Sequence, residues 1–366
     1  MGISALLFAI FVSLSSSAQA NREATHEISR DQPVWIGEAL FDVERLDDFQ
    51  EVLIVPVRVA GLVNVGVQRK LANKLADASG AGGIAVIYPD IGEPYRSVFT
   101  QIIDGIEDKA RGRVRNFPVG KDVDVGQLKE SMRRQDAKVV IALGRQGLRV
   151  ARSLESDLGL VVGGVLSASD DEVQSAQINS LSPDPALLFA RLKSMMPKVR
   201  RVLTVYDPRQ NEWLIRLAKD AARQQGLELV TYQAQDLRSA MRAYQEILAA
   251  ADVEKDALWL PQDSTTVEDS SVMPMLLQES WSRNLTMFSS SFSHVRRGVL
   301  FSLYPDNVDL GRSLAGSALS LMANGGNGSG LMPLREVLMA INLRTARHLG
   351  VNTSRLQSFD MAFPEQ

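Results

Sequence analysis

Polar and aromatic residues that could bind a small molecule lie just after the buried strands that the sequence predicts. In open α/β sheets, ligands bind at the carboxyl ends of the strands, where loops converge and helix N-termini supply donors. The residues at these positions combine aromatic rings, hydroxyls, amides and both charge signs, a mixture that suits a zwitterion such as an amino acid. In chain order they are Tyr88, Tyr95, Arg145, Gln146, Ser167, Ser169, Tyr206, Asp207, Asn211, Gln262, Asp263, Ser264, Ser289, Ser290, Ser291, Phe292, Ser302 and Tyr304.

Each of these residues also has a structural interpretation. Asp207, Asp263 and the serines favour helix N-caps, so capping is as good an explanation of any one of them as ligand contact. Tyr206 could belong to the core. Arg145 follows a buried strand, and its guanidinium needs an anion there. A ligand carboxylate would fit its fork, and a structural ion pair with an aspartate is the equal alternative.

The sequence offers no catalytic residues, metal ligands or cofactor motif. Its three histidines, His26, His294 and His348, are far apart, and it has no cysteine. A nucleophile elbow, a Walker A loop and a dinucleotide-binding glycine motif are all missing. A net charge of -3 argues against a nucleic-acid partner. We therefore expect a protein that is not an enzyme and needs no cofactor.

Short apolar runs alternate with amphipathic stretches from residue 83 onward. Runs without polar alternation predict strands buried on both faces, as in a parallel sheet covered by helices. Two strand–helix–strand blocks follow one another, and a tail then holds a helix near 308–322, a glycine-rich connector at 323–330 and a last strand near 334–341. A chain of 366 residues is long enough for two such lobes. The predicted strands of the blocks are 84–88, 114–119, 138–143, 160–166, 202–206, 227–232, 257–260 and 286–289.

The first twenty residues have the pattern of a secretory signal. Residues 3–14 are almost uninterruptedly apolar, and small residues then lead to Ala18-Gln19-Ala20. The stretch before the apolar run lacks Lys and Arg, and a buried N-terminal helix is the alternative. No later run approaches the roughly 20 apolar residues of a membrane span. We expect cleavage after Ala20 and a soluble periplasmic protein.

Several stretches resemble the family of ABC-transporter substrate-binding proteins whose characterised members take up aromatic amino acids. The resemblance covers about residues 83–350 and is best from 198 on. The stretches that carry it are KVRRVLTVYDP at 198–208, DALWLPQDS at 256–264, GVLFSL at 298–303, LGR at 310–312 and INLRTARHLG at 341–350.

The resemblance implies a type I periplasmic-binding-protein fold. Such a fold has two Rossmann-like lobes, a chain that crosses between the lobes three times, and a ligand in the cleft between the lobes. Lobe one would comprise 82–166 plus 305–326, and lobe two 167–304 plus 327–352. Residues 21–81 would be an N-terminal addition packed on lobe one, and 353–366 a tail. Family positions that line the cleft would fall on Tyr95, Arg145, Gln146, Tyr206, Asp207, Gln262, Asp263, Ser264, Ser291, Phe292, Ser302 and Tyr304.

Two departures from the family pattern lie in lobe one. Gly144-Arg145-Gln146-Gly147 stands where relatives carry a small Thr-rich turn, and residues 163–170 lack the usual Phe-x-x-Val-x-Asp-Pro turn. The resemblance therefore does not identify the ligand. The leading hypothesis is an exported, monomeric solute-binding protein that closes by hinge motion and delivers its ligand to an ABC permease. The alternative is an exported sensory or interaction protein that signals to a membrane receptor or envelope complex.

Overall fold

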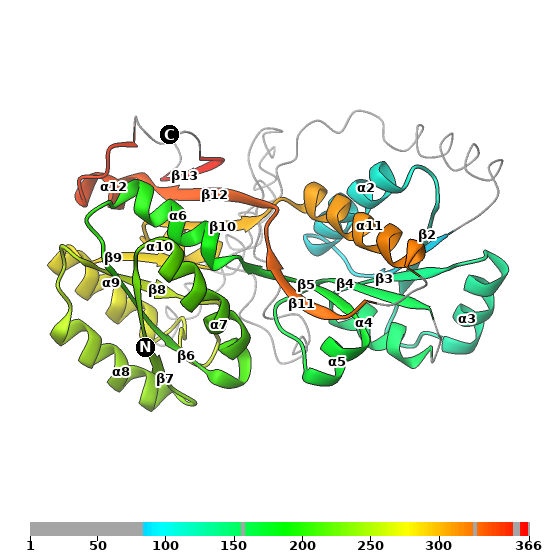
Figure 1. Ribbon diagram of the computed structural model, residues 1–366, viewed down its shortest axis with the longest axis horizontal. Helices are drawn as coiled ribbons and strands as arrows, with labels where there is room; N and C mark the ends of the chain where they lie inside the picture. The colour runs from blue at the N-terminus through cyan, green and yellow to red at the C-terminus, as the bar shows by residue number, and fades with distance from the viewer. Residues whose placement is uncertain (1–82, 155–157, 325–327, 354–358, 365–366) are drawn as a thin grey trace, which may run out of the picture.

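A computed structural model describes residues 83–154, 158–324, 328–353 and 359–364. The expected signal peptide, the N-terminal addition and part of the C-terminal tail lie outside these residues. Two sheets with helices on both faces make up the described chain (Figure 1). This confirms the predicted α/β class.

The first sheet has six strands, all paired in parallel, and we call it lobe one together with its helices. The strand order is β11-β5-β4-β3-β1-β2. The strands are β1 (Ile84–Pro89), β2 (Val114–Val119), β3 (Val139–Leu143), β4 (Gly159–Val165), β5 (Gln177–Pro183) and β11 (Gly330–Leu334). The helices are α2 (Tyr95–Ala110), α3 (Val125–Arg134), α4 (Gly144–Ser153), α5 (Asp170–Ser175) and α11 (Asn307–Ala323).

The second sheet has seven strands in the order β13-β12-β10-β9-β8-β6-β7, and we call it lobe two together with its helices. Only the pair β10–β12 is antiparallel in it. The strands are β6 (Arg201–Tyr206), β7 (Glu228–Gln233), β8 (Asp256–Leu260), β9 (Thr286–Ser289), β10 (Phe301–Pro305), β12 (Val337–Asn342) and β13 (Met361–Phe363). The helices are α6 (Pro185–Met195), α7 (Pro208–Gln224), α8 (Leu237–Ala250), α9 (Val272–Arg283), α10 (Phe292–Arg297) and α12 (Leu343–His348).

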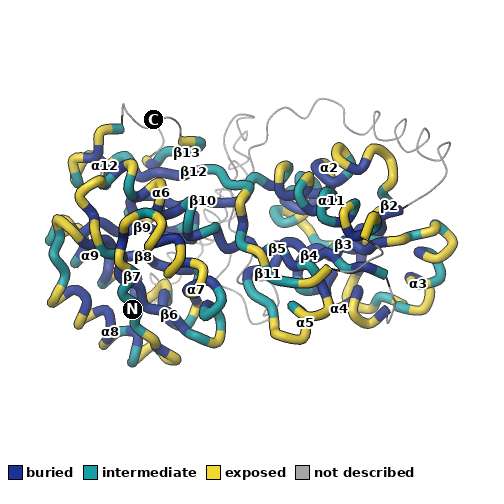
Figure 2. Tube along the Cα trace, viewed as in Figure 1, coloured by how far each residue is buried: buried dark blue, intermediate teal, exposed yellow. Residues whose placement is uncertain are grey.

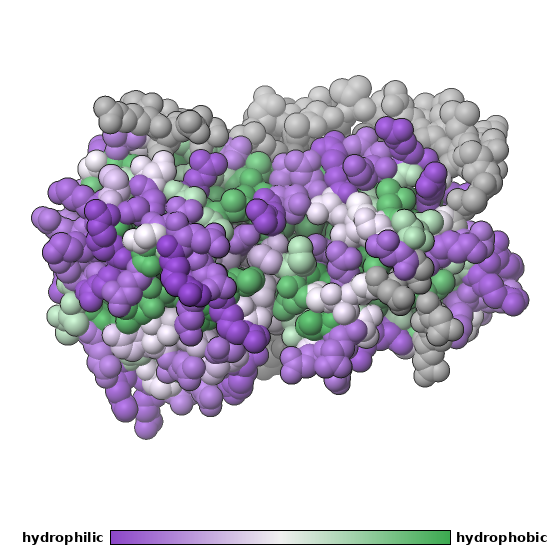
Figure 3. Space-filling view, in the orientation of Figure 1, coloured by the Kyte–Doolittle hydropathy of each residue, from purple (hydrophilic) through white to green (hydrophobic). Residues whose placement is uncertain are grey.

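The apolar strands form these sheets because helices bury both of their faces. Successive residues of β1 illustrate this, since Ile84 and Val86 join one apolar cluster while Ala85 and Ile87 join the cluster on the opposite face. The central strands are accordingly buried while the outer turns of the helices are exposed (Figure 2). Hydrophilic side chains dominate the visible outer surface of both lobes (Figure 3). No helix within the described ranges has the length and apolar character needed to cross a membrane.

The chain passes between the lobes three times. It leaves lobe one after β5, returns after β10 and leaves again after β11 (Figure 1). Two backbone hydrogen bonds join these passages, from Asp184 N to Leu334 O at 2.8 Å and from Asp306 N to Glu336 O at 3.0 Å. The three passages therefore run as one bundle between the two sheets.

Two of the three passages differ from the expected lobe boundaries. The expected boundary after residue 166 falls too early because β5 adds to the first sheet, and the boundary after 326 falls too early because β11 does the same. The last strand, predicted near 334–341, corresponds to β12, and β11 precedes it with Arg335 and Glu336 between the two.

Two glycines let α2 and α11 pack at very short range in lobe one. A Cβ at Gly105 would lie 2.0 Å from the carbonyl oxygen of Val308, and one at Gly311 would lie 2.0 Å from that of Ile102. No side chain fits in such a space, so the two backbones touch directly. This contact holds α11 to lobe one although it follows β10 of lobe two in sequence.

Candidate functional site

The carboxyl ends of the parallel strands in the two lobes face one another. β5 runs directly into α6 of lobe two, so its carboxyl end points toward lobe two, and β1 to β4 are parallel to it. β10 runs into α11 of lobe one, and β6 to β9 are parallel to β10. We call these two facing sheet edges the interlobe faces. They are the edges at which open α/β sheets bind ligands.

Asp207 begins α7 on the interlobe face of lobe two. Its carboxylate accepts a hydrogen bond from the Arg209 backbone N–H at 3.0 Å, and Pro208 occupies the first helical turn. The predicted cap is therefore present. The Arg209 guanidinium also binds this wholly buried carboxylate, at 2.5 Å. The hydrogen bond from Arg209 holds the pKa of Asp207 below its usual range although burial acts in the opposite direction.

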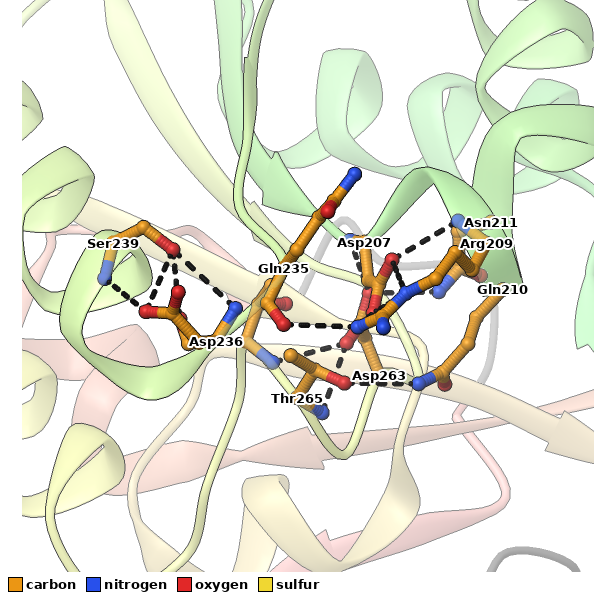
Figure 4. A network of polar contacts seen from close by, with 10 residues as sticks. Asp207, Arg209, Gln210, Asn211, Gln235, Asp236, Ser239, Asp263 and Thr265 are labelled. Carbon is orange, nitrogen blue, oxygen red and sulfur yellow. Dashed lines mark hydrogen bonds and ion pairs between the residues drawn. The ribbon is translucent and has the colours of Figure 1, made fainter.

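Asp263 ties the loops after β6 and β8 together (Figure 4). Its carboxylate accepts hydrogen bonds from Asp207 N at 2.7 Å and from the side-chain amide of Asn211 at 2.9 Å. It also accepts from the backbone N–H groups of Thr265 at 3.1 Å and Thr266 at 2.9 Å. Both carboxylate oxygens are thus occupied by donors of the protein itself. Asp263 shapes this interlobe face rather than presenting a free charge.

Tyr206 has a buried ring and a fully engaged hydroxyl. The hydroxyl donates to Glu212 at 2.8 Å and accepts from the side-chain amide of Gln233 at 3.0 Å. Burial is the main cause that raises the pKa of Tyr206. The structure therefore supports the core interpretation of this residue.

Four further predicted residues lie around β9, α10 and β10. Phe292 and Tyr304 pack edge to face with ring centroids 5.1 Å apart, and Phe363 of β13 packs edge to face on Phe292 with centroids 5.5 Å apart. The Ser302 hydroxyl is buried and donates to the Leu303 carbonyl. Ser291 precedes α10, and its hydroxyl lies 2.9 Å from that of Ser293. The two aromatic rings belong to an apolar cluster, and Ser291 is the partly exposed member of this group.

Arg145 in lobe one is held by an ion pair. Its guanidinium lies 3.0 Å from the Glu172 carboxylate and also donates to the Ser167 carbonyl oxygen. Burial would raise the pKa of Glu172, but the Ser169 N–H and the charges of Arg145 and Arg152 outweigh burial and lower it. The structural alternative for Arg145 is therefore present, with a glutamate in place of the expected aspartate.

Gln146 and Tyr95 complete the lobe-one side. The amide of Gln146 donates to the carbonyl oxygens of Val119 at 3.0 Å and Gly120 at 2.8 Å, which fixes the loop after β2. Tyr95 starts α2 and is half-buried, and burial raises the pKa of its phenol. The Tyr95 hydroxyl makes no hydrogen bond with any residue that the structure describes.

Two predicted residues, the half-buried Tyr95 and Gln262, are suited to meet a ligand without breaking a side-chain hydrogen bond to another described residue. The exposed Ser264 lies in the same loop as Gln262. The side-chain amide of Gln262 has no hydrogen-bond partner within the described part of the chain. Tyr95 lies on one interlobe face, and Gln262 and Ser264 lie on the other. They could therefore contact one small molecule from opposite sides.

The sequence did not reveal which residues of the protein itself pair with the charged candidate residues. Arg209 and Glu172 are the clearest cases, since one binds Asp207 and the other binds Arg145. A local signal existed for Glu172, because Ser169-x-x-Glu172 has capping-box spacing and the Ser169 N–H donates to the Glu172 carboxylate at 2.8 Å. The same signal cannot show that Glu172 reaches Arg145, which lies in another helix.

Residues 188–356 match the model of a family described as ABC transporter substrate binding protein. A substrate binding protein with adhesive properties from Clostridium difficile, in a ligand-free, open structure, is 13% identical, with 76% of this chain and 98% of that chain covered and a TM-score of 0.53. An ABC domain in complex with L-Trp from Streptococcus pneumonia is 15% identical, with 77% and 100% covered and a TM-score of 0.46. A conserved domain protein from Vibrio cholerae is 16% identical, with 77% and 99% covered and a TM-score of 0.46. No curated protein matches the sequence.

At these identities the structural likeness concerns the fold, and it is carried by the Clostridium difficile protein. The family match concerns mainly lobe two, where the interlobe loops of β6 and β8 lie. The matched family consists of substrate-binding proteins, a non-enzymatic kind of protein that generally works outside the cytoplasm. The chain has the two-lobed fold of type I periplasmic binding proteins and resembles the ABC-transporter substrate-binding family.

Proposed function

We propose that this protein is an exported solute-binding protein that captures an amino acid or another small carboxylate between its lobes and delivers it to an ABC permease. The observation that carries the proposal is that the carboxyl edges of the two sheets face one another and that the bundle of three passages connects the lobes. Such a bundle can bend as a hinge and close the interlobe faces on a ligand. In this proposal Tyr95, Gln262 and Ser264 make the first contacts.

The charged residues of the site hold its walls in shape. Asp207 and Asp263 fix the loops of lobe two, and Arg145 fixes α4 against α5. An incoming carboxylate could still engage the Arg209 guanidinium, because its side chain is 61% exposed. The backbone donors at the beginning of α7 add to this positive potential.

A thermal-unfolding screen against amino acids, small carboxylates and nucleosides tests capture. A true ligand at 100 times its Kd stabilises the protein by roughly 2.7 kcal/mol, which is a clear increase in Tm. Gln262→Ala should weaken binding of the hit about fivefold, the value of one hydrogen bond. Gln224→Ala, at the far end of α7, is the matched control and should bind normally. Equal affinity of the two variants would remove Gln262 from the site, and a screen without any hit would contradict capture.

Export and delivery need separate tests. Mass spectrometry of the protein from its native envelope should give Asn21 as the first residue, because cleavage is expected after Ala20. Deleting the gene should abolish uptake of the ligand that the screen identifies. Normal uptake combined with a lost transcriptional response would favour the sensory alternative.

A further inference from the structure

A cavity of about 840 Å³ lies in lobe two, at the edge of the sheet opposite its interlobe face. Leu285, just before β9, and Asn342, at the end of the antiparallel β12, both line it, so it opens at the amino ends of the parallel strands. The ends of α9 and α10, together with α12, form the rest of its wall; this region is at the left of Figure 1. Its volume is within the roughly 300–1,000 Å³ typical of small-molecule pockets. The cavity is therefore separate from the site between the lobes.

The ionisable residues that line this cavity are all basic. They are Arg296, Arg297, Arg344 and His348, and no aspartate or glutamate is among the lining residues. Asp269, which is not part of the lining, lies 2.6 Å from the Arg297 guanidinium and balances that charge. Arg344 has no ion pair with any described residue. A cationic cavity in a chain with a net charge of -3 is a local feature and not a property of the whole surface.

An aromatic platform stands at the rim of the cavity. The ring of Trp281 stacks on that of His348 with centroids 3.9 Å apart and planes 6° from parallel. The Arg344 guanidinium lies 5.1 Å from the Trp281 ring centroid. Trp281 nevertheless remains 39% exposed, although it is one of the largest apolar side chains of the protein. A hydrogen bond of 3.0 Å between His348 Nε2 and the Trp281 carbonyl oxygen holds the two rings in this stacked arrangement.

Apolar side chains form the floor beneath this platform. Leu285, Met287 and Phe363 are buried and line the cavity. A ligand would therefore find an apolar floor, a flat aromatic surface at the rim and guanidinium groups beside both. This combination is complementary to a flat apolar body that carries a negative charge.

We propose that this cavity is a second binding site of the protein, for an organic anion with a flat apolar body. The anionic group, a carboxylate, sulfonate or phosphate ester, pairs with Arg344. The apolar body lies over the floor and against Trp281. Because the site is at the opposite edge of the sheet, it can be occupied whether or not the interlobe site is.

Calorimetric titration of the mature protein with 1-naphthoate and with the neutral 1-naphthamide tests this site. We expect saturable binding of the carboxylate and binding of the amide that is weaker by roughly tenfold or more, because a charge-assisted hydrogen bond is lost. Arg344→Gln and Trp281→Leu should each weaken naphthoate binding by about the same factor. Arg216→Gln, an exposed arginine on α7, is the matched control and should bind like the unmodified protein. Circular dichroism confirms that each variant is folded.

Several results would overturn the proposal. Absence of saturable naphthoate binding, equal binding of the amide, or unchanged affinity in both Arg344→Gln and Trp281→Leu would each do so. Loss of naphthoate binding in Gln262→Ala with normal binding in Arg344→Gln would place the anion between the lobes. Failure of the interlobe ligand screen has no bearing on these outcomes, so the two proposals can be judged separately.

Discussion

The guanidinium of Arg145 lies 3.0 Å from the carboxylate of Glu172 and thereby joins α4 to α5 at the interlobe face of lobe one. The Arg145 side chain is 30% exposed and that of Glu172 is 14% exposed. The pair is thus protected from water in part. Its contribution to stability should lie between that of surface pairs and that of fully buried ones.

A double-mutant cycle with Arg145→Gln and Glu172→Gln should show a coupling free energy of about 1 kcal/mol in urea unfolding. The exposed pair Arg133–Glu130 is the matched control, and its coupling should be about 0–0.5 kcal/mol. Equal coupling in the two cycles would show that burial adds nothing to the Arg145 pair. If Arg145 binds the ligand carboxylate instead, Arg145→Gln would abolish ligand binding while Glu172→Gln would strengthen it.

Asp263→Asn should destabilise the protein by about 2–3 kcal/mol. The asparagine has one acceptor oxygen, and its amide group would face N–H donors that the carboxylate accepts now. Ligand binding should weaken as well, because the loops after β6 and β8 lose their tie. Asp220→Asn, on the exposed surface of α7, should change the free energy of unfolding by less than about 0.5 kcal/mol. A loss confined to ligand affinity, with stability unchanged, would contradict the positioning role.

Gly105→Ala should be among the most destabilising single substitutions in lobe one. The added methyl group would lie 2.0 Å from the Val308 carbonyl oxygen, so α2 and α11 must separate, and we expect a loss of about 3 kcal/mol or more. Gly316→Ala is the matched control, since it lies in α11 with no atom within 4 Å of its Cβ position. It should stabilise the helix by up to about 1 kcal/mol. Thermal unfolding of both variants measures the difference, and similar Tm values would show that the helices are not in contact at Gly105.

The free energy of unfolding should fall in mild acid because His294 is buried as a neutral ring. Its ring is buried, with Nδ1 2.8 Å from the Ser289 hydroxyl, and burial lowers its pKa to about 4. The positive charge of Arg297 acts in the same direction, while Asp269 opposes it. An unfolded chain binds this proton near pH 6.5. Below that pH the unfolded state therefore binds more protons than the folded state, and stability falls until about pH 4.

The change attributable to His294 should reach about 2–3 kcal/mol over this window. Urea unfolding at several pH values between 7.5 and 4 measures it. His294→Gln should flatten this part of the profile, because the glutamine cannot take up a proton. Parallel profiles of the variant and the unmodified protein would show that His294 is not the group responsible.

The sequence predicted the buried apolar strands, such as β3 and β8, and missed β5 and β11. β3 and β8 are fully buried runs, and each lies within two residues of its predicted position. β5, with the sequence QINSLSP, is half polar, yet Ser180 is buried because its hydroxyl donates to the Leu166 carbonyl at 2.5 Å. β11 contains a glycine and a proline. Both strands pair with each other at the edge of the first sheet, which is a relationship that no local pattern reveals.

The sequence indicated which polar residues follow the strands better than it indicated which partners their side chains bind. Asp207 was a candidate cap and a candidate ligand residue, and the cap is confirmed by the hydrogen bond from Arg209 N. Arg145 needed an anion, and the one that it has comes from a residue 27 positions away in another helix. Pairing at such sequence distance depends on how the helices pack, so residue type alone could not decide between ligand and protein as the partner.

The order of the strands in lobe one has a consequence for how the chain is made. Its sheet is completed by β11 at residues 330–334. Both β11 and α11 are synthesised only after all of lobe two except β12, α12 and β13. Lobe two in turn needs β12 and β13 from the last part of the chain. Neither lobe can reach its complete native form while the ribosome still holds the C-terminal residues. A chain that stops before residue 330 should therefore lack an edge in both lobes and be cleared by proteases.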